Sequence, residues 1–188
     1  MIKILVVGPV KSGKTTVTNI IADISDGVLE AYWPTKALRI VEIEKEAPLV
    51  VKKQFPGNVT VELWDVSGDP KYEKCLPIIL KNAQGIIFVY NPEETGDMEK
   101  TMEYYINQYA KAARILPKQC MAFAHHFDCD GEPKKAKMLN CFKGVPVSDC
   151  TAENTSTIVP AFEKYFAHLM TILGEKQEQD EKKLMENI

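Results

Sequence analysis

A glycine-rich loop directly after a short apolar run constrains the fold of this chain more than any other feature. The run covers residues 2–7, and residues 8–15 match the pattern GxxxxGK[ST]. The loop reads Gly8-Pro9-Val10-Lys11-Ser12-Gly13-Lys14-Thr15. A helical pattern follows over about residues 15–24, so the loop joins a buried strand to a helix. This context is typical of a phosphate-binding loop.

Each residue type in the loop has a physical reason to be there. The glycines let the backbone wrap a phosphate so that several N–H groups point inward. Lys14 can bridge the β- and γ-phosphates, and the Thr15 hydroxyl can bind Mg²⁺, which prefers hard oxygen ligands. We therefore predict a site for a magnesium–nucleoside triphosphate. The nucleotide-binding residues predicted in this segment are Gly8, Val10, Lys11, Ser12, Gly13, Lys14, Thr15 and Thr16.

Short apolar runs alternate with helical patterns along the chain, which predicts an α/β fold with a mostly parallel sheet. The predicted strands cover residues 2–7, 38–44, 59–65, 85–90, 119–124 and 145–147. The predicted helices lie near residues 15–24, 72–81, 97–114 and 157–173. No helix separates the second strand from the third, so we expect a hairpin that adds one antiparallel edge strand. We predict helices on both faces of this six-stranded sheet.

Composition limits the number of domains and the classes of partner. The 188 residues are 45% hydrophobic, which is enough for one well-buried core. A net charge of -3 argues against nucleic acid as a partner. The five cysteines form no disulfide framework and no secretory signal is evident, so we expect a cytoplasmic protein. No lipidation motif is present, and we expect no direct membrane anchor.

The final segment, residues 174–188, differs in composition from the rest. No apolar residue occurs from 175 to 183. We therefore predict one domain over residues 1–173, followed by a charged tail that is solvated and frays. The alternative is a helix that docks on a partner through Leu184, Met185 and Ile188.

A second motif makes a family resemblance visible. Asp65 and Gly68 form a DxxG pattern at the end of the third predicted strand. Together with the loop and the strand order, it resembles the Ras-superfamily small GTPases over about residues 1–173. Three further segments resemble the Rab-like small GTPases of the intraflagellar transport machinery. These segments are Tyr32-Trp33-Pro34-Thr35, Glu62-Leu63-Trp64-Asp65 with Gly68-Asp69, and Cys120-Met121-Ala122-Phe123-Ala124-His125-His126.

The resemblance implies a Ras-like P-loop domain that binds GTP or GDP with Mg²⁺. It also implies docking on coiled-coil subunits of the intraflagellar transport complex B, in the cilium or flagellum and at its base. The metal site would combine Thr15 with Thr35 and Asp65, where Thr35 binds Mg²⁺ only in the triphosphate state. The Gly68 N–H would contact the γ-phosphate. The alternative for Thr35 is an ordinary loop residue after a proline.

Two departures from the family pattern predict slow or absent GTP hydrolysis. Asp69 stands where hydrolysing members carry a glutamine that orients the attacking water, and a carboxylate there repels the γ-phosphate. Val10 stands at a loop position where efficient members usually have glycine. The chain is therefore at most a slow GTPase, and no catalytic residue is assigned.

The base-binding motifs also depart from the pattern. His125-His126-Phe127-Asp128 stands where the family has NKxD, with Asp128 at the position that recognises guanine. Thr151, Ala152 and Glu153 match the later base-backing element weakly. If Asp128 only caps a turn, adenine would bind comparably.

Three other readings of the sequence are weaker. A P-loop nucleoside or nucleotide kinase needs several arginines around its phosphates, and this chain has only Arg39 and Arg114. A structural adaptor with a vestigial loop is a second alternative. Zinc ligation lacks matched spacing. The candidate ligands are His125, His126, Cys120 and Cys129.

Overall fold

A six-stranded sheet forms the centre of the computed structural model, which describes residues 1–24, 34–127, 135–151 and 155–186. The strands are β1 (Ile2–Val7), β2 (Leu38–Glu46), β3 (Asn58–Val66), β4 (Gly85–Tyr90), β5 (Cys120–His126) and β6 (Val147–Thr151). Their order is β2-β3-β1-β4-β5-β6, and β2 at the edge is antiparallel to β3 while the other neighbours are parallel. This confirms the predicted sheet and its antiparallel edge strand.

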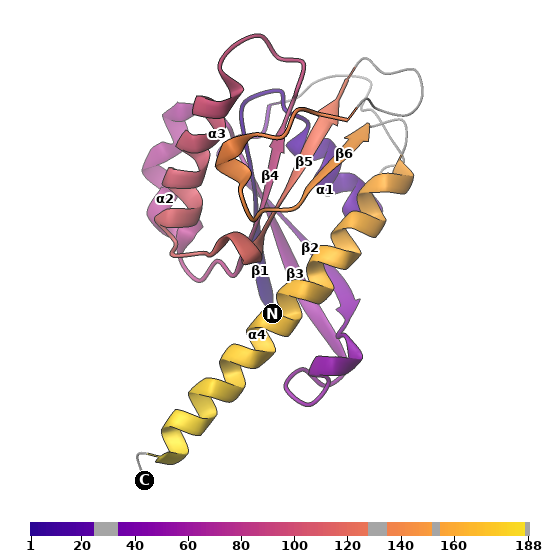
Figure 1. Cartoon of the computed structure of the whole chain (residues 1–188), viewed down its shortest axis with the longest axis vertical. Coiled ribbons are helices and arrows are strands. Elements are labelled where there is room, and N and C mark those ends of the chain that lie inside the picture. Colours follow the sequence, from indigo (N-terminus) through magenta and orange to yellow (C-terminus); the bar gives the residue numbers. More distant parts are fainter. Residues whose placement is uncertain (25–33, 128–134, 152–154, 187–188) are drawn as a thin grey trace.

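Helices cover both faces of the sheet, as predicted (Figure 1). Helices α1 (Lys14–Ile21) and α4 (Ile158–Glu186) pack on one face, where Ile4, Val17 and Phe162 belong to one buried cluster. Helices α2 (Leu76–Leu80) and α3 (Met98–Tyr105) pack on the other face. Alternate residues of β1 point to opposite faces, so this fully buried strand supplies both clusters.

Lys3 interrupts the apolar run of β1 and is nevertheless 7% exposed. Its amino group donates to the main-chain oxygens of Ile78 (3.3 Å) and Lys81 (2.9 Å) at the end of α2. The same nitrogen lies 3.3 Å from the centroid of the Trp64 ring. These contacts compensate for the burial of its charge and fix the end of α2 against the sheet.

Two of the predicted helices differ in detail from the structure. The segment predicted near 72–81 begins as a 3₁₀ helix over Pro70–Cys75 and continues as α2, because Pro77 cannot donate a hydrogen bond. The segment predicted at 97–114 is α3 followed by a π-helical stretch over Ile106–Lys111. The sixth strand lies at Val147–Thr151, later than the predicted residues 145–147. The prediction missed Ser148, Asp149 and Thr151 because these polar residues break the apolar pattern by which a strand is recognised.

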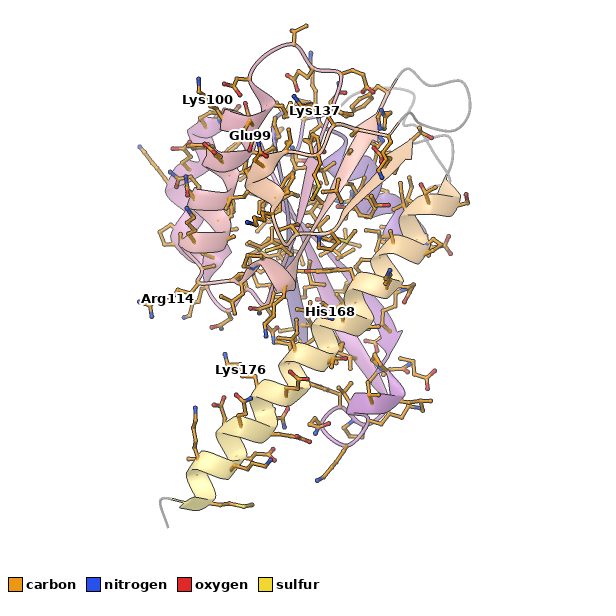
Figure 2. The ribbon with its side chains drawn as sticks, viewed as in Figure 1. Glu99, Lys100, Arg114, Lys137, His168 and Lys176 are labelled. Atoms are coloured by element: carbon orange, nitrogen blue, oxygen red, sulfur yellow. The ribbon has the colours of Figure 1, made fainter. Side chains whose placement is uncertain are left out.

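Helix α4 extends far beyond the predicted end at residue 173. It continues to Glu186 and projects past the sheet, with Lys176 on the projecting part (Figure 2). Every described side chain from Glu175 to Met185 is exposed. The segment is solvated, as predicted, but it is helical rather than frayed, because Glu, Lys and Gln are strong helix formers and no helix breaker follows Gly174.

Within the described residues, no helix combines the length and the apolar character needed to cross a bilayer.

Candidate functional site

The glycine-rich loop connects the carboxyl end of β1 to the first residue of α1, as the sequence predicts. Gly13 precedes the helix with φ of 88°, a backbone conformation that favours glycine. A Cβ atom at Gly8 would lie 2.0 Å from the main-chain oxygen of Val89 on β4. Both glycines are therefore required by the path of the loop over the sheet.

Lys14 turns its amino group back into the loop. The side chain is 6% exposed, and its nitrogen donates to the main-chain oxygen of Pro9 (2.5 Å) with the Ser12 hydroxyl at 3.5 Å. Burial lowers the pKa of Lys14 to about 8, although the charge of Asp65 opposes this shift. The lysine thus lies inside the curve of the loop, where phosphate oxygens could replace its internal partners.

The three predicted metal ligands converge beside the loop, although they are far apart in the sequence. The Thr15 hydroxyl donates to Asp65 Oδ2 at 2.7 Å, and the Thr35 hydroxyl donates to the same oxygen at 3.2 Å. The two hydroxyl oxygens are 3.1 Å apart. The convergence brings together residues from α1, from the segment before β2 and from the end of β3.

Asp65 is fully buried, and its second oxygen, Oδ1, has no hydrogen-bond partner among the described residues. Burial raises the pKa of Asp65, against the opposing effects of Thr15, Lys14, Thr35 and Arg39. A buried carboxylate oxygen without a donor is costly unless a cation compensates it. The donor set is three hard oxygens, which fits Mg²⁺.

Gly68 lies directly against the loop. A Cβ atom there would be 2.6 Å from Gly8 O, Pro9 C and Val10 N. The Tyr105 hydroxyl of α3 donates to the Gly68 main-chain oxygen at 3.4 Å. Only glycine allows this close approach, so the DxxG element lies next to the predicted phosphate site.

Asp69 directs its carboxylate to Lys71. Its Oδ2 atom lies 2.6 Å from the Lys71 amino nitrogen, and Oδ1 accepts from the Lys71 main-chain N–H at 3.1 Å. Hydrogen bonding to Lys71 lowers the pKa of Asp69. A carboxylate that is held in its ionised form is a weaker base toward water.

His125 is fully buried at the end of β5, beneath the loop. A Cβ atom at Gly13 would lie 2.5 Å from its Nδ1 atom, and the ring meets Phe127 edge-on at 4.4 Å between centroids. Burial lowers the pKa of His125 to about 4, with a smaller effect from His126. The neutral imidazole thus packs against Gly13, and neither of its ring nitrogens has a hydrogen-bond partner among the described residues.

His126 stands next to His125 in the segment that replaces the family's NKxD motif, and it ends β5. The side chain is 2% exposed, and its two ring nitrogens face Glu93 and Asp149. It is therefore held between two carboxylates. No sequence signal points to Glu93, which lies 33 residues away and belongs to no motif.

The remaining predicted residues fall into three groups. Ser12 is buried, Thr16 is half-buried, and Val10 and Lys11 are exposed at the rim of the loop. Thr151 is buried at the end of β6, beside His126 in the strand register. The predicted residues that lie outside the described parts of the chain are Tyr32, Trp33, Asp128, Ala152 and Glu153.

The structure does not support the zinc site or the kinase that were considered as alternatives from the sequence. Across residues 1–24, 34–127, 135–151 and 155–186, no group of three or more His, Cys, Asp or Glu side chains could hold a metal ion, so zinc has no site there. Cys129, a candidate ligand, lies outside these ranges. Arg39 donates to Asn19 at 2.6 Å. Arg114 follows the π-helical stretch and precedes β5, so it lies near the amino ends of the parallel strands, whereas the loop lies at their carboxyl ends (Figure 2).

Comparison with known proteins agrees with this geometry. The family described as "Ras of Complex, Roc, domain of DAPkinase" matches residues 3–128. A Danio rerio protein named "Intraflagellar transport protein 22 homolog" is 32% identical over 184 residues, which are 96% of each chain.

Two solved structures also resemble the chain. A GTP-bound crystal structure of Trypanosoma brucei IFT22/74/81 has a TM-score of 0.65 and 31% identity, and the match covers 91% of this chain and 98% of the other. A GDP-bound crystal structure of Trypanosoma brucei IFT22 has a TM-score of 0.59 and 27% identity, with 91% and 96% covered.

Proposed function

Because the chain belongs to the intraflagellar transport protein 22 family and has a Ras-like GTPase domain, we propose that it binds GTP and GDP with Mg²⁺ as a subunit of the intraflagellar transport machinery. The observation that carries this proposal is the convergence of Thr15, Thr35 and Asp65 beside the loop. The similar Trypanosoma brucei chains were solved in GTP-bound and GDP-bound forms, which supports the same ligands here.

Different residues of the site would contact different parts of the ligand. Thr15, Thr35 and Asp65 would hold Mg²⁺, which neutralises charge on the phosphates when it is bound. Lys14 would exchange its bond to Pro9 for phosphate oxygens. The main-chain N–H of Gly68 would reach the γ-phosphate, because no side chain intervenes.

We test nucleotide binding with two measurements. Nucleotide released from freshly purified protein is identified by chromatography, and GTP or GDP is the expected result. Calorimetry then compares the wild-type protein with Lys14→Ala, which should lose most of its affinity for Mg–GTP. Lys176→Ala, on the projecting part of α4, is the matched control and should bind normally. Undiminished binding by folded Lys14→Ala would refute the proposed site.

Hydrolysis is proposed to be slow, on the order of 10⁻⁴ to 10⁻³ per second. Asp69 pairs with Lys71, and this ion pair weakens it as a base. Val10 is 45% exposed at the rim of the loop and would crowd an incoming arginine finger. Single-turnover phosphate release checks the rate, and a value near that of a fully assisted GTPase contradicts the proposal. Asp69→Gln should speed release only if Val10 is not the dominant obstacle.

Docking on coiled-coil subunits of intraflagellar transport complex B, in the cilium or flagellum and at its base, completes the proposal. The IFT22/74/81 assembly of Trypanosoma brucei supports it, since it contains a chain similar to this one. The γ-phosphate would order the segments around Thr35 and Gly68 and so complete a binding surface. Size-exclusion chromatography with the purified partners, in GTP and in GDP, tests this. Failure to co-elute with either nucleotide would refute the docking.

A further inference from the structure

Gly68 is flanked by two hydrogen bonds that tie it to different parts of the fold. On its amino side, the Ser67 main-chain N–H donates to the Ala37 main-chain oxygen at 2.9 Å, just before β2. On its carboxyl side, the Tyr105 hydroxyl of α3 donates to the Gly68 main-chain oxygen at 3.4 Å. The Gly68 N–H, which the proposed function directs to the γ-phosphate, therefore lies between two anchored groups.

Apolar packing alone does not fix the segment around Gly68. Glycine has a wider choice of backbone conformations than any other residue, so its N–H keeps one direction only where its neighbours hold it. The 3₁₀ helix that follows, Pro70–Cys75, contains no buried residue. A cavity lies between this helix and α3, and its lining includes Gly68, Leu76 and Tyr105. Hydrogen bonds are therefore the main restraint on this segment.

The Tyr105 hydroxyl is itself held in place by the packing of its ring. The side chain is 8% exposed, and its ring stacks on the Tyr109 ring with 5.9 Å between centroids and 13° between planes. The Tyr104 ring meets it edge-on at 5.4 Å. The Tyr104 hydroxyl donates to Glu73, which ties the 3₁₀ helix to α3. A donor that is locked by packing on a helix fixes its acceptor more closely than a donor on a loop.

The chemistry of the two partners sets the direction of the Tyr105 hydrogen bond. Burial raises the pKa of Tyr105 far above its usual range, so the hydroxyl keeps its hydrogen near neutral pH. The main-chain oxygen of Gly68 can only accept. The Cα of Gly68 faces the phosphate loop, because a Cβ atom there would lie 2.6 Å from Gly8 O and Val10 N. Gly68 thus contacts the loop through its Cα and Tyr105 through its oxygen.

We infer that Tyr105 is a positioning residue for the Gly68 N–H and so favours the binding of a nucleoside triphosphate over a diphosphate. This inference rests on the proposed function, and it names a residue that belongs to none of the sequence motifs. GDP lacks the γ-phosphate that the Gly68 N–H would contact. Loss of the Tyr105 hydroxyl should therefore weaken the binding of the triphosphate and leave the binding of GDP unchanged.

The test compares Tyr105→Phe, which keeps the ring and removes only the hydroxyl, with the wild-type protein. Calorimetry measures the affinities for Mg–GDP and for the Mg²⁺ complex of a GTP analogue that carries nitrogen between its β- and γ-phosphates and is not hydrolysed. The ratio of triphosphate affinity to diphosphate affinity should fall roughly threefold to tenfold, the size expected for the loss of one hydrogen bond. A general loss of stability would weaken the binding of both nucleotides and leave this ratio unchanged.

Dissociation rates and two further variants strengthen the test. Release of the triphosphate analogue should become roughly threefold to tenfold faster in Tyr105→Phe, while release of GDP should not change. Tyr105→Leu removes the hydroxyl from a side chain of different shape and should lower the affinity ratio to a similar extent. Tyr109→Phe is the matched control, because it removes a hydroxyl from the ring that stacks on Tyr105, and it should keep the wild-type ratio. Melting temperatures without nucleotide show that each variant is folded.

The outcomes distinguish the inference from the proposed function. If the wild-type protein binds both nucleotides but folded Tyr105→Phe changes the affinity ratio by less than about twofold, the inference is overturned and the proposed function stands. If Tyr109→Phe lowers the ratio as far as Tyr105→Phe does, the effect belongs to the tyrosine packing as a whole and the inference is again overturned. If the wild-type protein binds neither nucleotide, both are overturned. A fall in the ratio that is confined to the Tyr105 variants supports both.

Discussion

Replacing Asp65 with Asn should stabilise the nucleotide-free protein and remove its response to Mg²⁺. Asp65 is fully buried, with one oxygen bonded to two hydroxyls and the other without a partner in the described structure. Burial raises its pKa, so the folded protein holds this proton more tightly than the unfolded chain. The stability that the protonated form contributes is lost as pH rises through the folded-state pKa. The advantage of the neutral amide should therefore grow with pH.

The size of the effect follows from the burial of this group. Leaving a charged buried group unsatisfied costs about 1 kcal/mol more than leaving a neutral one unsatisfied. For a chain of this length, about 1 kcal/mol corresponds to a rise of about 2–4 °C in melting temperature. In the wild-type protein Mg–GDP at about 100 times its Kd should add about 2.7 kcal/mol. Most of the part that depends on Mg²⁺ should vanish in Asp65→Asn.

Differential scanning fluorimetry measures both effects, at about pH 5 and about pH 8, with GDP alone and with GDP and Mg²⁺. Asp180→Asn, which neutralises an exposed carboxylate on α4, is the control and should change neither quantity. A lower melting temperature for nucleotide-free Asp65→Asn would refute the reasoning about burial. An equal response of both proteins to Mg²⁺ would refute the metal site.

Three further predictions concern the loop and the helices. Gly13→Ala should lower the free energy of unfolding, measured in urea, by about 1–3 kcal/mol. Its Cβ atom would lie 2.5 Å from His125 Nδ1, and its backbone conformation is strained for alanine. An unchanged free energy would contradict this close packing. Phe162→Ala, in the buried core, should cost about 3–5 kcal/mol, whereas Val159→Ala, partly exposed one turn away, should cost less than about 1 kcal/mol. Deletion of residues 179–188 should lower the helical circular dichroism signal. It should change the free energy of unfolding by less than about 1 kcal/mol, because the described side chains there are exposed. A larger decrease in the free energy of unfolding would show that this part of α4 packs against the rest of the domain.

The sequence predicts the phosphate loop and the metal ligands because each belongs to a motif with a local physical signature. Thr15 follows from its position at the start of the helix after the loop and Asp65 from its position at the end of a strand, and the structure brings their oxygens within hydrogen-bonding distance. The mostly parallel sheet follows from the alternation of strands and helices, and its antiparallel edge strand from the missing helix between the second and third strands. Such features depend on neighbours in the chain, and sequence patterns record them.

The features that the sequence does not predict are of two kinds. Some arise from contacts between residues far apart in the chain, and others from segments that have no apolar pattern. The pairing of His126 with Glu93 and Asp149 joins residues 33 and 23 positions away, and no motif links them. The polar residues of β6 hide its position, because burial at the end of a sheet does not require an apolar pattern. The extension of α4 lacks an apolar stripe, so its helix comes from residue propensity alone.

The projecting end of α4 makes the molecule a body with an arm. From Gly174, which packs against Val51, to Glu186 the helix spans about 18 Å at 1.5 Å per residue. A rotation of about 10° about Gly174 would move the far end sideways by about 3 Å, roughly the length of a hydrogen bond. A small rotation of the domain therefore produces a larger sideways displacement at the far end of α4. The length of the helix limits how far a group bound at that end can lie from the body of the protein.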